Sequence, residues 1–210
     1  MATKFLDDAA RAAFKRAVET VENASAVEVV VAVRRRSAAY RHANVAVGAV
    51  VAFAGLAAML FSTHEFALTS ILIDPFVVAL LAGGLVELLP AVKRVLTPRT
   101  MRHATVTRAA RATFVERGVH NTTGRSGLLV YISWLEQEVV LVADSGLARE
   151  LPEGDLARAQ AELTAAMRSG ATVARGVEAL AAAMGRAMPH RDDDVNELPD
   201  AIDSDMERAT

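Results

Sequence analysis

The chain has 210 residues, is 52% hydrophobic and carries a formal net charge of -2. It is apolar for a soluble protein of this size but too polar for a polytopic transporter, so we expect one globular domain with a short membrane segment. The near-neutral charge gives no general attraction to nucleic acid. Cysteine is absent, which excludes disulfides, a thiol nucleophile and thiolate metal ligands.

The sequence opens with a predicted helix and a predicted buried strand. Residues 7–23 place Phe14 and Val18 on one face at helical spacing. Residues 26–33 form a near-continuous run of β-branched and apolar residues, which predicts a strand buried on both faces inside a sheet. Residues 1–42 offer no partner strand, so we expect the partners to follow later in the chain.

Residues 43–92 predict a transmembrane hairpin of two helices. Residues 43–61 carry no charge and would span roughly 28 Å, close to the thickness of the hydrocarbon core. The second span covers residues 67–92. Within it, Asp74 suits an N-cap and Pro75 the first helical position, so we expect a helix to begin there. The residues just before them either lie near the outer interface or extend the helix.

The glycines of the hairpin, and Glu87 as the one acid well inside the second span, each have two interpretations. The glycines either allow close helix packing or simply reflect composition. Glu87 lies inside the second span. It forms either an ion or proton site or a pair with Lys93 and Arg94 near the membrane edge. We favour the second, because a lone acid makes a poor relay. The glycines are Gly48 and Gly55 in the first span and Gly83 and Gly84 in the second.

Basic residues flank both spans and predict the topology. The connecting loop, residues 62–66, has His64 and Glu65 as its only ionisable residues and contains no lysine or arginine. The positive-inside rule therefore places this loop outside and both termini in the cytoplasm. The basic clusters lack interleaved aromatic residues, and we expect no nucleic-acid binding. The expected partners are the membrane and, through the hairpin, another membrane protein. The flanking residues are Arg34, Arg35, Arg36 and Arg41 before the first span, and Lys93, Arg94 and Arg99 after the second.

The second half of the chain predicts further helices and strands. Asp155 is placed to cap one of the helices, and residues 144–146 read as a turn. The order αβ, hairpin, αββαα predicts an α/β fold: a small mixed sheet packed with helices and interrupted by the transmembrane hairpin. The expected helices are 101–117, 155–168 and 172–188, and the expected strands are 127–134 and 138–143. We divide the chain into the first part of a soluble domain (1–42), the hairpin (43–92), the second part of the domain (93–189) and an acidic tail (190–210).

Three strings resemble the TPM-domain family, in its branch of bacterial membrane proteins with a hairpin inside the domain. They are SAVEVVVAVRRRSAAY at 25–40, NTTGRSGLLVYISWLEQEVVLVADSG at 121–146 and VNELPD at 195–200. The resemblance implies an αβα sandwich fold, and with the hairpin it predicts a protein of the bacterial cytoplasmic (inner) membrane. Family functions include an acid phosphatase and assembly, repair or receptor-auxiliary proteins. Many family members place the domain outside the cytoplasm, but here the arginines favour the inside. Gln137 stands where the family commonly has arginine, which weakens any phosphate-handling role of that turn.

Asp144 is the candidate for a catalytic or metal-binding residue. It follows a predicted strand directly, Gly146 permits a tight turn beside it, and it matches the aspartate of the family's D-x-G string. It either takes part in divalent-cation or phosphate chemistry or satisfies backbone donors in the turn, and we favour the second. The acids at 192–194 with Glu197 lack EF-hand spacing and read as a solvated tail. We predict no cofactor, with a divalent cation at Asp144 as the alternative.

The favoured function is a membrane-anchored binding, assembly or maintenance module with no evident catalytic set. The alternative is a membrane-tethered, metal-assisted phosphatase. That alternative requires Asp144, Glu136 and residues 121–126 to converge, and it fails if they lie far apart. The pair Leu198-Pro199 suggests a short anchored contact, but the sequence leaves open whether the tail docks or hangs free.

Overall fold

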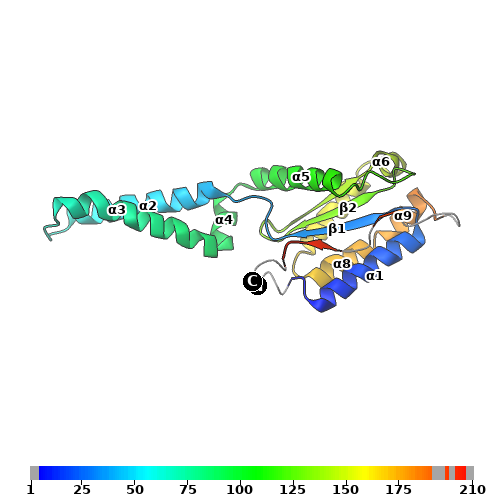
Figure 1. The fold of residues 1–210 in the computed structure, drawn as a ribbon, viewed down its shortest axis with the longest axis horizontal. Helices are drawn as coiled ribbons and strands as arrows, with labels where there is room; N and C mark the ends of the chain where they lie inside the picture. The colour runs from blue at the N-terminus through cyan, green and yellow to red at the C-terminus, as the bar shows by residue number, and fades with distance from the viewer. Residues whose placement is uncertain (1–4, 191–196, 199–201, 207–210) are drawn as a thin grey trace. The chain divides into compact units, whose positions relative to one another are not determined.

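The computed structural model describes residues 5–190, 197–198 and 202–206 (Figure 1). The chain separates into two compact units. We call Met1–Ser37 with His103–Thr210 the α/β unit, and Ala38–Arg102 the hairpin unit. The α/β unit is therefore assembled from sequence on both sides of the hairpin.

The α/β unit contains a four-stranded mixed sheet in the order β3-β2-β1-β4. Strand β1 pairs in parallel with β2 on one side and with β4 on the other, and β2 pairs antiparallel with β3. The first three strands confirm the sequence prediction, whereas β4 lies in the segment read as a solvated tail. The strands are β1 (Val29–Arg34), β2 (Leu128–Ser133), β3 (Glu138–Ala143) and β4 (Asp203–Ser204).

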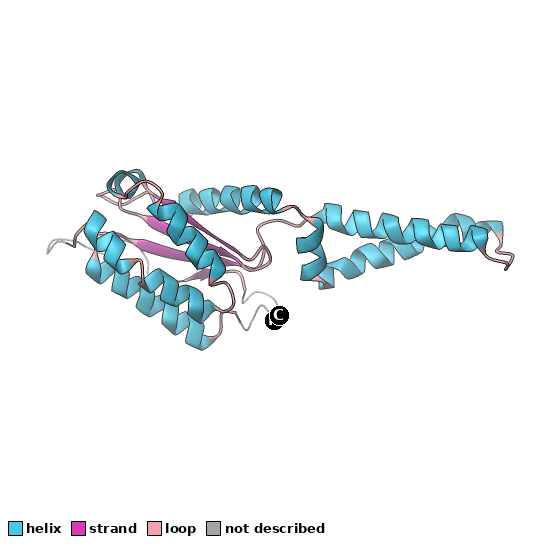
Figure 2. Ribbon diagram, turned by 180° about the vertical axis from the view of Figure 1, so that it is seen from behind, coloured by secondary structure: helices cyan, strands magenta, loops and turns pink. Residues whose placement is uncertain are grey.

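Helices cover both faces of this sheet, which gives the expected αβα sandwich (Figure 2). On one face Val29 and Val31 pack into a core shared with four helices and with Leu147 of the short helix Ser145–Glu150. On the other, Val30 and Ala32 pack against α5 (Arg99–Glu116). Burial on both faces explains the continuous apolar run of β1. The four helices are α1 (Asp8–Ala24), α7 (Asp155–Ala165), α8 (Gly170–Glu178) and α9 (Ala181–Ala187).

Three local predictions in this unit are wrong. Asp144 is not part of a simple turn, because it caps a short helix, α6 (Ser145–Glu150). Asp155 does not cap α7: the N-cap is Gly154, at φ 85°, and the Asp155 carboxylate instead accepts from Arg158 at 2.8 Å. The helix expected over residues 172–188 is divided into α8 and α9.

The hairpin unit consists of two long apolar helices followed by short ones. Among the described residues, two helices, Arg41–Phe61 and Leu68–Leu88, are long and apolar enough to cross a membrane by length and composition. Large apolar side chains on them are exposed, for example Phe53 at 73% and Leu80 at 78%. The elements are α2 (Arg41–Phe61), α3 (Leu68–Leu85), the 3-10 turn η2 (Val86–Leu88) and α4 (Pro90–Leu96).

The expected helix start at Asp74 and Pro75 is wrong. Helix α3 begins at Leu68, with Ala67 as N-cap, and continues through Pro75, which is buried. The second arrangement considered, an extension of the helix, is the one observed. Proline lacks an N–H, so one helical hydrogen bond is lost at this position. Apolar helices that pack against a neighbour tolerate such a loss.

Only two of the four hairpin glycines lie where the helices touch. A Cβ atom at Gly48 would lie 2.7 Å from the Ala79 carbonyl oxygen, and one at Gly83 would lie 2.9 Å from the Asn44 carbonyl oxygen. Gly55 and Gly84 have nothing within 4 Å of that position. Close packing within the hairpin therefore depends on Gly48 and Gly83.

Substitution by alanine should distinguish the glycines at the helix contact from the glycines with open space around them. Gly48→Ala pushes a methyl group into backbone and should cost about 1–3 kcal/mol of hairpin packing. Gly55→Ala, on the same helix, should be neutral or gain up to about 1 kcal/mol through helix propensity. Hydrogen exchange of residues 41–61 in detergent micelles measures the difference. Equal protection in the two variants would contradict the assigned contact.

Candidate functional site

Asp144 lies at the end of β3 and caps α6. Its Oδ1 accepts from the Ser145 N–H at 2.6 Å, and its own N–H donates to the Gly127 carbonyl at 2.8 Å. The side chain is buried, with 7% of the residue exposed. Asp144 therefore satisfies a backbone donor, as the favoured interpretation expects, but it does so at the start of a helix rather than in a turn.

The other carboxylate oxygen of Asp144 faces an arginine. Oδ2 is buried without a hydrogen-bond partner and lies 3.6 Å from Nη1 of Arg125. Arg125 is held at φ 51°, and its Nη1 donates to the His120 carbonyl at 3.0 Å. Gly146 is required here by close approach, because a Cβ atom would collide with the carbonyl oxygens of Gly124 and Arg125. A cation at Asp144 would have to displace the guanidinium group.

Part of the acidic tail docks on the loop beside Asp144. The Glu197 carboxylate accepts from both the N–H and the hydroxyl of Thr123, at 2.8 and 2.6 Å. The Leu198 N–H donates to Oε2 of Glu28 at 3.3 Å, and the Leu198 side chain packs against the α5-side core. The sequence left the docking of this segment open, and Leu198 shows the anchored contact. The acids at 192–194 and Pro199 lie outside the described residues.

Glu136 does not join Asp144, so the convergence required for the phosphatase alternative is wrong. Strand pairing sets Leu128 opposite Ala143 at one end of the β2–β3 hairpin and Ser133 opposite Glu138 at the other. Glu136 lies in the turn beyond Ser133, whereas Asp144 follows Ala143. A strand of six residues is about 20 Å long, so the two acids are separated by the length of the hairpin.

Glu136 instead belongs to a buried polar cluster that the sequence did not reveal. Its carboxylate accepts from the Ser37 N–H at 2.9 Å and from the Ser133 hydroxyl at 2.5 Å. The Ser37 hydroxyl lies 2.8 Å from the Ser133 hydroxyl and 3.3 Å from that of Tyr131. The available signals were a serine inside an apolar strand and an acid between two strands. The cluster fixes the chain at Ser37, where it leaves the α/β unit.

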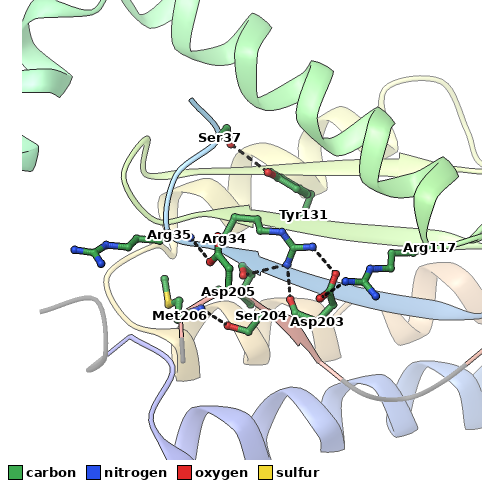
Figure 3. A network of polar contacts seen from close by, with 10 residues as sticks. Arg34, Arg35, Ser37, Arg117, Tyr131, Asp203, Ser204, Asp205 and Met206 are labelled. Atoms are coloured by element: carbon green, nitrogen blue, oxygen red, sulfur yellow. Dashed lines mark hydrogen bonds and ion pairs between the residues drawn. The ribbon is translucent and has the colours of Figure 1, made fainter. Parts of the chain in front are cut away.

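A second polar network surrounds β4 (Figure 3). The Asp203 carboxylate pairs with two guanidinium groups, those of Arg34 and Arg117, and the distance from Arg117 Nη2 to Asp203 Oδ1 is 2.6 Å. The Arg35 N–H donates to Oδ1 of Asp205 at 2.7 Å. From the sequence, Arg34 and Arg35 are expected only to orient the membrane hairpin. No local pattern links them to acids about 170 residues away.

In the hairpin unit, Glu87 pairs with Lys93. Lys93 Nζ lies 2.7 Å from Glu87 Oε2 and donates to the Ala39 carbonyl at 3.4 Å. The other Glu87 oxygen accepts from the Asn44 side-chain amide at 2.9 Å. The Lys93 side chain is buried, while that of Glu87 is 44% exposed. The geometry agrees with the favoured interpretation of a pair at the base of the hairpin.

Among the residues that the structure describes, no group of three or more histidine, aspartate or glutamate side chains is arranged to hold a metal ion. Asp144 is thus placed beside an arginine rather than within a cluster of acids.

Comparisons with known proteins support the fold. No protein-family model and no curated protein matches the sequence. Among solved structures, the chain is similar to the BA42 protein of the psychrophilic bacterium Bizionia argentinensis, determined by NMR. The TM-score is 0.57 at 15% sequence identity, with 95% of each chain covered. BA42 has a TPM-like fold. At this identity the likeness shows the fold alone.

The capping role of Asp144 predicts a specific pattern of stabilities. Asp144→Ala should lower the free energy of unfolding by about 1 kcal/mol, whereas Asp144→Asn should change it by only a few tenths, because asparagine caps nearly as well. Asp155→Ala, at a helix start without a side-chain cap, is the matched control and should stay within about 0.5 kcal/mol. Urea titration followed by fluorescence of Trp134, the single tryptophan, reports on the α/β unit. A loss in Asp144→Asn as large as in Asp144→Ala would contradict the capping role.

The buried hydroxyl of Tyr131 predicts a pH dependence. Burial raises the pKa of Tyr131 above 10.0, against the opposing effect of its hydrogen bond with Ser37. Above that pH the unfolded chain releases this proton while the folded chain keeps it, so the contribution to stability is complete below pH 10.0 and falls as pH rises. The loss relative to Tyr131→Phe should approach about 1.4 kcal/mol per pH unit.

The measurement is urea unfolding of the parent and Tyr131→Phe between neutral pH and pH 11, read from Trp134 fluorescence. At neutral pH the variant should be about 1 kcal/mol less stable, since it loses the hydrogen bond to Ser37. The difference should shrink in alkali. A difference independent of pH would show that Tyr131 ionises equally in the folded and unfolded states.

Proposed function

We propose that this chain is a membrane-anchored binding, assembly or maintenance module, whose hairpin inserts in the bacterial cytoplasmic membrane. The exposed apolar surface of α2 and α3 carries the proposal. Each of the two helices contains an apolar stretch of 18 residues. Only 6% of this stretch is buried in Arg41–Phe61, and only 17% in Leu68–Leu88. Soluble proteins rarely expose a contiguous apolar surface of this extent to water, whereas lipid would cover it.

The orientation proposed places both termini in the cytoplasm. Arg41 precedes the first span, and Lys93, Arg94 and Arg99 follow the second. The connecting loop carries no lysine or arginine. This asymmetry supports a short external loop under the positive-inside rule. In this proposal residues 43–92 form the membrane hairpin, and 1–42 with 93–189 and the docked tail segments form the cytoplasmic domain.

A binding role is supported by what the polar groups of the α/β unit do. Asp144 caps a helix, Glu136 holds Ser37, and Glu197 holds Thr123. Each of these acids is engaged by the chain's own backbone or hydroxyl groups. The phosphatase alternative needed Glu136 and Asp144 in one place, and strand pairing separates them. We therefore do not propose it.

Fractionation and accessibility labelling test the proposal. The chain should stay with the membrane pellet after extraction at alkaline pH. Because the sequence has no cysteine, single cysteines can be placed at His64 and at the exposed Ser145. In sealed cells, a membrane-impermeant maleimide should label His64→Cys and spare Ser145→Cys, and disruption of the membrane should expose both.

Two outcomes would contradict this proposal in different ways. Recovery of the chain in the soluble fraction would remove the membrane anchor. Labelling of Ser145→Cys with protection of His64→Cys would keep the anchor but reverse the topology, and would place the α/β unit outside the cytoplasm.

A further inference from the structure

The edge of β1 is covered by a very short strand from the other end of the chain. Strand β4 pairs with β1 in parallel over two positions, Ala32 with Asp203 and Val33 with Ser204. On its other side β1 pairs with β2 over six positions. Loss of β4 would therefore leave the main pairing of β1 intact.

Two arginines from different elements converge on this short strand (Figure 3). Arg34 ends β1, and Arg117 follows α5 directly. Arg34 pairs with the Asp203 carboxylate and also donates through Nη1 to the Asp203 carbonyl at 2.8 Å. Arg117 takes the other carboxylate oxygen at 2.6 Å. One acidic residue thus satisfies two guanidinium groups, an arrangement suited to recognition of a carboxylate.

The neighbouring residues of the segment are recognised as well. The Asp205 N–H donates to the Val33 carbonyl at 3.3 Å, while its side chain accepts from the Arg35 N–H. Met206 is buried, with 6% exposed, and packs into the core of the α1 side together with the partly buried Ile202. The segment that occupies the site therefore has the pattern apolar, acidic, small, acidic, apolar, and its backbone pairs with that of β1.

The segment is held by the burial of Met206 and by ion pairs that are partly exposed. The Asp203 side chain is 18% exposed and that of Arg117 51%, and partly exposed ion pairs contribute about 0–1 kcal/mol each. A strand tethered to its own site experiences an effective concentration on the order of millimolar, so it can occupy a site of weak intrinsic affinity. A separate strand of the same chemistry can compete for that site.

We propose that the edge of β1, with Arg34 and Arg117, is a recognition site for an extended acidic segment of a partner protein, which adds to the sheet as a parallel strand. The chain's own Ile202–Met206 occupies this site and keeps it closed until a partner strand replaces it. Strand addition of this kind combines backbone pairing for affinity with side-chain sites for specificity. The inference rests on the proposed binding role, but it concerns only the α/β unit and does not depend on the membrane anchor.

Peptide binding to the full chain in detergent micelles tests the site. The probe is a fluorescent peptide of sequence Ile-Asp-Ser-Asp-Met, identical to residues 202–206, read by anisotropy. In the variant Asp203→Asn with Asp205→Asn, the chain's own strand loses its charges and should leave the site. This variant should bind the probe at least about tenfold more tightly than the intact chain, because the tethered competitor is removed. The neutral peptide Ile-Asn-Ser-Asn-Met should bind neither form.

Additional substitutions assign the binding to the two arginines. In the background of Asp203→Asn with Asp205→Asn, Arg34→Gln or Arg117→Gln should each weaken probe binding at least about fivefold, in line with loss of a charge-assisted contact. Arg158→Gln, on the distant surface of α7, is the matched control and should leave binding unchanged. Binding that survives both site substitutions would overturn the proposal.

Release of the strand is measured separately through Ser204→Cys. Its reaction with maleimide should accelerate when Asp203 and Asp205 are neutralised. An unchanged rate would show that the ion pairs do not hold the strand and would overturn the proposal. So would a released strand with no binding of the acidic probe. A dimer of the intact chain that is lost on neutralisation would assign the site to a second copy. None of these outcomes changes the extraction result, so failure of this inference is distinguishable from failure of the membrane anchor.

Discussion

The parallel pairing of β1 with β2 is the interaction on which the rest of the structure depends. The two strands come from opposite sides of the hairpin, and both are buried on both faces. Parallel strands cannot be joined by a tight turn and require a long crossover connection. Here the crossover contains α5 and, before it, the whole hairpin unit. Because the entropic cost of closing a loop grows slowly with its length, a connection that must already be long accepts a large insertion.

The residues of the α/β unit that flank the insertion are held by polar contacts around the β2–β3 turn. Glu136 holds the Ser37 N–H, and Glu138 pairs with His103. Main-chain bonds from Trp134 and Leu135 to the Arg34 and Arg35 carbonyls extend the same attachment. These contacts fix the last residues of the unit on either side of the hairpin. The α/β unit can therefore be well ordered whatever the hairpin contacts.

The sequence predicted those parts whose signal is local and apolar. The β-branched runs of β1, β2 and β3 and the helical stripes needed only short-range patterns, and the fold class followed from their order. The predicted helix start at Asp74 and Pro75 was wrong because this local capping signal competes with the longer, mostly apolar stretch around it, which is helical on both sides of Pro75. Strand β4 was beyond reach, because two residues, aspartate and serine, have no strand pattern of their own.

In the candidate site, too, contacts between neighbouring residues could be predicted and contacts between distant residues could not. That the Asp144 side chain bonds to nearby backbone could be expected, because such bonds depend on neighbouring residues, although the sequence predicted a turn and not helix α6. The cluster of Ser37, Tyr131, Ser133 and Glu136 could not, since it joins residues almost 100 positions apart. Polar side chains in apolar strands hint at such clusters, but they do not identify the partner.

The acidic tail contacts β1 near both of its ends, and this constrains how the site on β1 can work. Near the start of β1, Leu198 bonds to Glu28, and at its end Asp205 bonds to Val33 and Arg35. An uncovered apolar edge strand invites pairing with other chains. The tail therefore protects an edge that would otherwise be a liability, and a partner that removes it must replace the same protection. This requirement favours an exchange of one acidic strand for another over simple opening of the site.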